Sequence, residues 1–189
     1  MKKNLLPLLV LCLAIVGLYS CGNMENKTDD MSTKNKETCK KIYEAIDKGD
    51  AEALNSLMAE NVVDHTPDPS MADKGLTGLS AVKQMIMTYH AAFPDMKTTI
   101  YSMTAEGDMV TIHYNMKGTN TGPMMGMAAT NKTIDVDGVD VVKLKDGMAT
   151  DHWGYSQEMK MMAQLGLTNP PPATAEATPE TAPPAEEKK

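Results

Sequence analysis

The chain has few cysteines, few aromatic residues and no concentrated basic segment. Its 189 residues include 3 cysteines, 1 phenylalanine and 1 tryptophan, and its formal net charge is -7. No cysteine pair and no closely spaced histidines occur, so the sequence predicts no metal site. It also has no glycine-rich phosphate loop between a strand and a helix, and no cofactor is expected. An acidic chain without a basic patch argues against a nucleic-acid partner.

The N-terminal segment has the order of an export signal. The chain begins Met-Lys-Lys, residues 5–18 are almost wholly apolar, and Cys21 follows. This order predicts a signal peptide over residues 1–20, and its end resembles the processing point of a bacterial lipoprotein. The resemblance implies lipidation at Cys21, a flexible tether over residues 21–35, and a protein anchored in the bacterial cell envelope on the exported side. An ordinary secretory signal is the alternative.

The C-terminal segment differs in composition from the rest of the chain. Residues 168–189 are a mixture of proline, alanine, glutamate and threonine, which predicts a disordered tail. Residues 36–167 then have about the usual size of one domain. Cys39 lies on the apolar stripe of the first expected helix, so we expect a core residue rather than a nucleophile.

Hydrophobic spacing predicts helices first and strands afterwards. Apolar residues recur at helical spacing up to Phe93, and alternation with a period of two follows. This order favours an α+β fold with an antiparallel sheet that packs its helices on one face. The expected helices are residues 36–48, a short one after Asp50, one capped by Ser80 and one capped by Ser156; the expected strands are residues 61–65, 97–105, 109–119, 133–144 and 148–155.

Strand alternation predicts which side chains face the helices. On the third long strand Asp140 shares a face with Val136, Val142 and Leu144, so its carboxylate is expected to point inward. On the preceding strand the inward face includes three pocket candidates, which are Tyr114, Met116 and Asn120. The parity of the last strand is ambiguous, and we favour His152 inward.

The segment from Asp140 to Trp153 is the main candidate site. A carboxylate among valines and leucines must find a partner or keep its proton, and both conditions are typical of acid/base sites. Asp140, Asp151, His152 and the only tryptophan come together around the Asp146-Gly147 turn. The alternative is a buried carboxylate that serves structure alone, since structural ion pairs also perturb titration.

Several short motifs follow one another in an order that resembles the SnoaL-like polyketide cyclases, also called ester cyclases. The similarity spans roughly Tyr43 to Leu167. The motifs are Asp64-His65, Phe93-Pro94-Asp95, Gly118-Thr119-Asn120-Thr121-Gly122, Asp146-Gly147, Asp151-His152-Trp153 and Gln164-Leu165-Gly166.

The resemblance implies a fold and a chemistry. The family has the nuclear transport factor 2-like fold, a cone in which a bent antiparallel sheet wraps around three or four helices, and such domains often form homodimers through the sheet. Its characterised cyclases close a ring by an aldol reaction without metal or cofactor, with an aspartate as general acid/base.

This chain departs from the family pattern at several of these positions. The family aspartate aligns with Gly154 here, and a family pocket histidine aligns with Asp140. Asn120 and Gln157 likewise replace a family histidine and a family acid.

Two classes of function follow. In the first, Asp140 is the base of an enzyme that acts on a small apolar carbonyl compound, His65 and His152 tune or relay its proton, and Asn120 donates to an oxyanion. In the second, the domain binds a small hydrophobic ligand or a protein of the cell envelope without catalysis. The pocket would be lined by Tyr114, Met116, Asn120 and Trp153 in either case.

The chain has 18 methionines, far more than a domain of this size needs. We favour a packing role, because flexible thioethers can fill a core that is short of aromatic residues. Copper(I) binding by Met124, Met125 and Met127 is the alternative.

Overall fold

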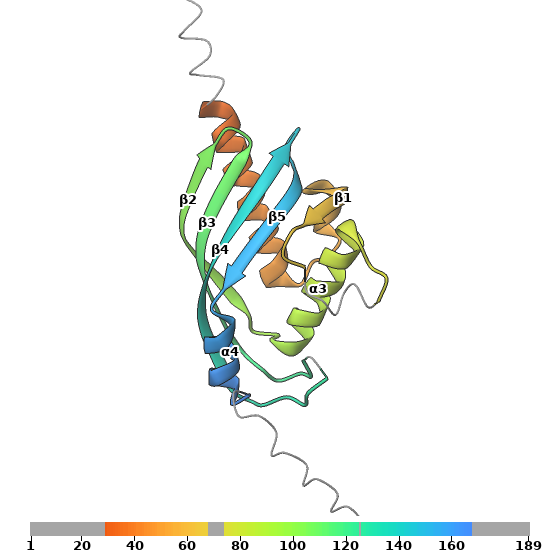
Figure 1. Ribbon diagram of the computed structural model, residues 1–189, viewed down its shortest axis with the longest axis vertical. Coiled ribbons are helices and arrows are strands. Elements are labelled where there is room, and N and C mark those ends of the chain that lie inside the picture. Colours follow the sequence, from red (N-terminus) through yellow and green to blue (C-terminus); the bar gives the residue numbers. More distant parts are fainter. Residues whose placement is uncertain (1–28, 68–73, 125, 168–189) are drawn as a thin grey trace, which may run out of the picture.

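The computed structural model describes residues 29–67, 74–124 and 126–167. Its elements are a helix over residues 29–48, η1 (Ala53–Ser56), β1 (Met58–Asp64), α3 (Gly78–Ala92), β2 (Lys97–Glu106), β3 (Met109–Thr119), β4 (Thr133–Lys145), β5 (Met148–Ser156) and α4 (Glu158–Leu165). Figure 1 shows the long strands side by side, with the N-terminal helix against one face of the sheet and α4 at its lower end. The signal, Cys21 and the C-terminal tail lie outside the described residues.

The sheet has five strands in the order β1-β5-β4-β3-β2. The long strands β2 to β5 pair antiparallel, each with its neighbour along the chain, as the alternation predicted. In the β4–β5 hairpin Asp146 and Gly147 both have positive φ, 53° and 81°, which is the backbone that favours an Asp-Gly turn. The short strand β1 pairs parallel with β5, so the expectation of an entirely antiparallel sheet was wrong at this edge.

The helices differ from expectation at their starts. The N-terminal helix already includes residues 29–35, which the sequence assigned to the tether, and Asn35 is buried there. The short helix after Asp50 is a single 3-10 turn, because β1 begins at Met58. The third helix begins at Gly78, earlier than predicted, and the last helix begins after Gln157, later than predicted.

No helix in the described ranges is long and apolar enough to cross a membrane.

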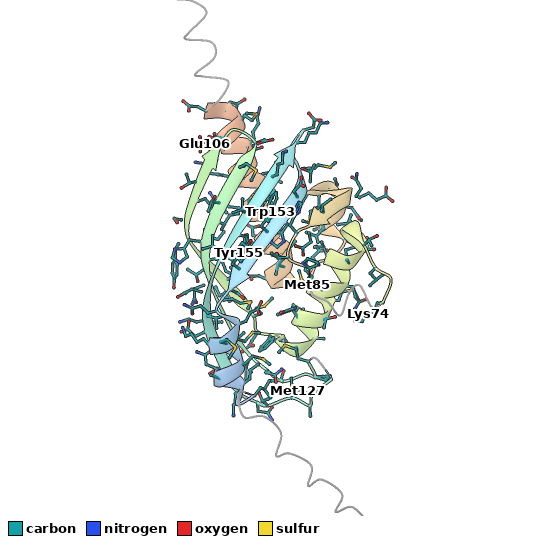
Figure 2. All side chains as sticks on the ribbon, in the orientation of Figure 1. Lys74, Met85, Glu106, Met127, Trp153 and Tyr155 are labelled. Carbon is teal, nitrogen blue, oxygen red and sulfur yellow. The ribbon has the colours of Figure 1, made fainter. Side chains whose placement is uncertain are left out.

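The inner face of β4 carries two separate apolar clusters. Val142 and Leu144 pack with Ile42 and Tyr43 of the N-terminal helix in the first cluster. Toward the other end of β4, the second cluster gathers around Phe93 at the end of α3 and includes residues of α4. Figure 2 labels Glu106, at the upper end of β2, and Met127, in the loop between β3 and β4 near the lower end of the molecule. Asp140 lies on this face between the clusters.

A β-bulge in β5 decides which residues of that strand face inward. The pairing with β4 shifts between Ala149 and Asp151, which leaves Thr150 as the extra residue. Because of this shift Ala149 and His152 both face the helices, although their sequence parity differs. The predicted inward orientation of His152 is therefore confirmed, whereas Trp153 faces the other side of the sheet.

Candidate acid/base site

Four polar side chains from four elements form a connected chain on the inner face of the sheet. The hydroxyl of Tyr43, on the N-terminal helix, donates to Oδ2 of Asp140 on β4 over 2.5 Å. The same carboxylate oxygen lies 3.5 Å from Nε2 of His152 on β5. The other ring nitrogen of His152, Nδ1, lies 3.1 Å from Oδ1 of Asp64 at the end of β1. His152 is thereby held between two carboxylates.

Asp64, the last residue of β1, is held by Thr66, two residues further along the chain. The backbone N–H and the hydroxyl of Thr66 both donate to Oδ1 of Asp64, over 3.0 and 3.3 Å. The Thr66 hydroxyl in turn accepts from the backbone N–H of Gly154, over 2.8 Å. These bonds join the end of β1 to the part of β5 that faces Asp140, so they orient the histidine and its two partners as one unit.

Two glycines provide the space for this cluster. A Cβ at Gly138 would lie 2.5 Å from the hydroxyl oxygen of Tyr114, its cross-strand partner on β3. A Cβ at Gly154 would lie 2.9 Å from Cε1 of His152 and 3.2 Å from Oδ1 of Asp140. Glycine inside a strand often marks a place where another group must approach the backbone closely. Here the missing side chains leave room for a phenol and an imidazole beside one carboxylate.

The cluster is sheltered but reaches solvent. The side chains of Asp140, His152 and Asp64 keep 15%, 24% and 21% of their accessible surface. Burial alone would lower the pKa of His152, but its hydrogen bonds with Asp140 and Asp64, and their negative charges, raise that pKa from 6.5 to about 9. Burial alone would raise the pKa of Asp64, but hydrogen bonds from His152 and Thr66 lower it. His152 therefore carries a proton at neutral pH.

The phenol and thiol groups around Asp140 remain protonated at neutral pH. Burial, followed by the negative charge of Asp140, raises the pKa of the Tyr43 and Tyr114 phenols far above the usual range. The two rings lie 5.3 Å apart between their centroids. Burial also raises the pKa of Cys39 to about 12, and its side chain is 1% exposed, which agrees with the expected core role. The phenols can therefore donate hydrogen bonds but not act as anions at neutral pH.

His65 and Trp153 do not join the cluster, in contrast to their expected roles. The rings of His65 and Trp153 stack on each other with centroids 4.2 Å apart. Nε2 of His65 lies 3.0 Å from Oδ1 of Asp151. Because Asp151 and Trp153 alternate with the inward His152 and Gly154, this group occupies the opposite face of the sheet. On that face His65 is not placed to relay the proton of Asp140 directly.

Asn120 is also not the oxyanion donor that the sequence suggested. Its amide nitrogen donates to the carbonyl oxygens of Ala92 and Gly122. Its amide oxygen accepts from the backbone N–H and the hydroxyl of Thr130. The side chain is 2% exposed, and these bonds use both of its donor hydrogens. Asn120 therefore ties the loop after β3 to the end of α3.

The remaining predicted residues divide between the site and the core. Tyr114 lies beside Asp140, as expected of a pocket residue. Met116 is partly buried against the second cluster, and Met124 is part of that cluster. Met125 lies outside the described residues. Within those residues no group of three His, Cys, Asp or Glu side chains could hold a metal ion.

Two open hollows lie elsewhere on the surface. One, of about 280 Å³, is lined by residues of β2, β3 and β4 that include Lys97 and Lys117. The other, of about 410 Å³, lies between the N-terminal helix and β2 and includes Lys36, Lys40 and Tyr101. Neither is lined by a residue of the Asp140 cluster.

Several contributors to the site were not predicted from the sequence. Tyr43 lies one turn after Cys39 on the N-terminal helix, and its hydroxyl needs a partner because the ring is buried; Asp140 supplies that partner. Asp64 and Thr66 flank His65 in the sequence but lie on the inner side. Gly138 could have indicated that another group approaches the strand closely at this point, because glycine is uncommon inside a strand.

The fold and the site define an α+β domain with an acid/base cluster on the concave side of a curved sheet. The SnoaL-like polyketide cyclase family matches residues 37–165 of the sequence. This match covers more than half of the chain, and the protein belongs to that family. No curated protein matches the sequence significantly.

Solved structures agree with this assignment. TsrD from Streptomyces laurentii superposes with a TM-score of 0.64 at 20% identity, covering 71% of this chain and 96% of TsrD. IdmH, a proposed polyketide cyclase from Streptomyces antibioticus, has a TM-score of 0.61 at 28% identity, covering 70% and 98%. A proposed polyketide cyclase from Bacillus cereus has a TM-score of 0.62 at 24% identity, covering 71% and 82%. The predicted fold class is confirmed.

Proposed function

We propose that the protein catalyses cofactor-free acid/base chemistry, of the aldol cyclase or isomerase type, on a small apolar carbonyl compound. The observation that carries this proposal is the connected chain of Tyr43, Asp140, His152 and Asp64 on the inner face of the sheet. A carboxylate beside a protonated imidazole offers a base and an acid within one site, which is the arrangement that such reactions need.

Each residue has a separate role in this proposal. Asp140 is the general base, and Tyr43 holds its Oδ2 by a hydrogen bond. His152 is the general acid, since its pKa of about 9 keeps it protonated at neutral pH. Asp64 is a positioning residue, because its contact with Nδ1 orients the ring and leaves Nε2 toward Asp140.

The reaction balances without an external reagent. Asp140 takes the proton from a C–H next to a carbonyl group, and the electron pair of that bond moves to the carbonyl oxygen as an enolate, whose negative charge the protonated His152 stabilises. The enolate carbon then forms a bond with the carbon of a second carbonyl group, whose oxygen receives a proton from Nε2 of His152. The proton on Asp140 returns to the histidine. The product is an isomer of the substrate.

The departure from the family pattern is consistent with this assignment. The family aspartate aligns with Gly154, and Asp140 is the residue that pairs with Gly154 across the two strands. The carboxylate of this chain thus comes from β4 instead of β5, on the same face of the sheet. The similarity to IdmH, at 28% identity, supports a carbonyl compound as the ligand class.

Deuterium exchange tests the proposal with a simple model substrate. Ethyl α-methylacetoacetate is a neutral β-keto ester with one acidic C–H between two carbonyl groups. Proton NMR in D2O follows loss of this hydrogen with wild-type protein and with Asp140→Asn. We expect the variant to lose about 100-fold or more of the catalysed rate, the usual contribution of a general base. Asp151→Asn, which removes the carboxylate on the opposite face, is the matched control and should keep the rate.

The alternative function is ligand or protein binding without catalysis. The hollow of about 410 Å³ next to Lys36 and Lys40 lies away from the acid/base cluster and could serve such a role. If wild-type protein exchanges neither this ester nor other neutral keto esters above the buffer rate, the enzyme proposal fails and the binding role is favoured.

We also propose that the protein is exported and anchored by a lipid on Cys21. The order of charged, apolar and cysteine residues at the N-terminus supports this. Labelling of cells with an alkyne fatty acid should mark the wild-type protein but not Cys21→Ser, and the variant should leave the membrane fraction. Equal labelling of both would contradict the proposal.

A homodimer through the outer face of the sheet is a further proposal. Val63, Val139 and Tyr155 support it, because they are 48%, 38% and 62% exposed and alternate with inward residues of β1, β4 and β5. Light scattering on the protein without its signal should give the mass of two chains, and Tyr155→Lys should reduce it to one. A single-chain mass for the wild type would reject the dimer.

A further inference from the structure

The hollow between the N-terminal helix and β2 lies at an open edge of the sheet. β2 is the last strand in the order of the described sheet, and Figure 1 shows it at the left edge. The hollow has a volume of about 410 Å³. It is lined by four residues of the helix and four of β2, which are Thr33, Lys36, Glu37, Lys40, Ile100, Tyr101, Ser102 and Met103.

The β2 side of this hollow is partly apolar. Ile100 and Met103 pack against the first core cluster but remain partly exposed. The pairing of β2 with β3 shifts between Ile100 and Ser102, so Tyr101 is the extra residue of a β-bulge. Tyr101 is 56% exposed. An extended segment that crosses this edge would therefore meet two aliphatic side chains and an accessible phenol ring.

The helix side carries two lysines that lack an ion-pair partner. Among the described residues neither Lys36 nor Lys40 pairs with an acid, whereas Lys34 and Lys48 on the same helix each pair with an acid one turn away. Lys36 and Lys40 are four residues apart, so they lie on the same side of the helix. Glu37 offsets only one of their charges. The hollow thus has an excess of positive charge in an acidic chain, which suits an acidic partner.

The chain itself contains a segment with matching chemistry. Residues 179–187 read Pro-Glu-Thr-Ala-Pro-Pro-Ala-Glu-Glu, with three prolines, three glutamates and no basic residue. Proline-rich segments favour the extended polyproline II conformation, in which they bind grooves that contain aromatic side chains. The glutamates would supply the negative charge that Lys36 and Lys40 lack.

The length of the tail allows it to reach the hollow. The described residues end at Leu167, directly after α4 at the lower end of the domain (Figure 1). Residues 168–178 would span about 34 Å in the polyproline II conformation, at about 3.1 Å per residue. A domain of this size has a radius of gyration of about 14 Å, so a path around its side is available.

We propose that residues 179–187 bind in the hollow of the same chain, with their carboxylates toward Lys36 and Lys40 and their prolines on the β2 side. Because the tail is covalently attached, its effective concentration at the hollow is in the millimolar range, and weak contacts are sufficient. The proposal is independent of the acid/base function, since no residue of the Asp140 cluster lines the hollow. The bound tail would also occupy the hollow that the alternative binding function requires.

A spin label on the tail tests this interaction. Ala182→Cys places a nitroxide label between the prolines, in nitrogen-15-labelled protein of residues 22–189. Cys39 should not react, because it is 1% exposed. We expect the amide signals of Lys36, Lys40 and Ser102 to lose intensity, and to regain it when the label is chemically reduced.

A pair of charge reversals on neighbouring helix residues is the matched control. Lys40→Glu should lower the ratio of bound to free tail about fivefold, which is the effect of about 1 kcal/mol from a surface ion pair. Lys41→Glu makes the same change at an exposed residue that does not line the hollow, and it should leave the intensity loss unchanged. Equal effects of the two reversals would reject the proposed contacts.

A mixed sample distinguishes the chain's own tail from that of a second copy. It combines nitrogen-15-labelled protein without the nitroxide and unlabelled protein with it. We expect no intensity loss around the hollow in this mixture. Loss there would mean that the tail binds another molecule and would reject binding within one chain. A label whose effect is confined to residues near Leu167 would reject any binding to the hollow.

Discussion

Asp140 and Gly154 face each other directly across β4 and β5, on the side of the sheet that packs against the N-terminal helix. The family aspartate aligns with Gly154, and the carboxylate of this chain belongs to Asp140, the other residue of the pair. A side chain at residue 154 would collide with His152, so the glycine and the inward histidine belong together. This relationship explains how an acid/base cluster can exist in a chain that lacks the aligned aspartate.

His152 should titrate far above the usual histidine range. Its pKa of about 9 results from the two carboxylates, which outweigh the effect of burial. We therefore expect Asp64→Asn to move the pKa toward 6.5, because the group that contacts Nδ1 loses its charge. Proton NMR of the imidazole signals over pH measures this directly. Asp151→Asn should leave the value unchanged, and an equal shift in both variants would contradict the assigned contacts.

The same histidine should make stability depend on pH. The folded pKa of His152, about 9, is above its reference value of 6.5, so the folded state holds a proton that the unfolded state releases. The resulting stabilisation is fully present below pH 6.5 and is lost as pH rises through about 9. Urea unfolding across this window should show a falling free energy for wild type. His152→Gln should flatten that decline, and a wild-type curve without it would refute the raised pKa.

Tyr43 should contribute to stability through its hydroxyl group. Tyr43→Phe keeps the ring but removes the donor at 2.5 Å from Asp140. Loss of a hydrogen bond to a charged group costs about 1.5–3 kcal/mol, and that is the expected decrease in the free energy of unfolding. The comparison is Tyr101→Phe, since that ring is 56% exposed and should change stability little. Equal effects of the two substitutions would argue against the Tyr43 contact.

Asn120 should prove structural rather than catalytic. Asn120→Ala removes four hydrogen bonds that join Ala92, Gly122 and Thr130. We expect a loss of about 2–4 kcal/mol in unfolding free energy, given the cost of leaving buried partners unpaired. The folded fraction should still exchange the β-keto ester at the wild-type rate. A stable variant with reduced exchange would restore the oxyanion role.

The sequence was sufficient for much of the fold because the long strands carry a clear period of two. The alternation of Val136, Val142 and Leu144 correctly predicted that Asp140 faces inward, and the Asp146-Gly147 turn correctly located the hairpin between β4 and β5. Contacts between segments that are far apart in the sequence could not be predicted in this way. Parallel pairing of β1 with β5 depends on where α3 lies, and a local pattern does not contain that information.

The site was predictable only in part for the same reason. The parity of β5 could not be assigned because Thr150 forms a bulge, which no residue type marks in the sequence. His65 was expected in the site, but alternation at the end of β1 sends Asp64 inward and His65 outward, and Asp64 had been given no role. Asn120 was given the correct face, yet its bonding partners lie on a loop whose path the sequence does not specify.

The pH dependence of catalysed exchange is the sharpest test of the proposed site, because it reports on Asp140 and His152 working together. The rate constant for ethyl α-methylacetoacetate is measured against pH, after subtraction of the buffer rate. We predict that wild-type activity declines as pH rises through about 9, where His152 loses its proton, that this decline disappears in His152→Gln, and that Asp140→Asn is inactive throughout. Wild-type activity that continues unchanged through this pH range, or exchange that survives in Asp140→Asn, would contradict the assigned roles.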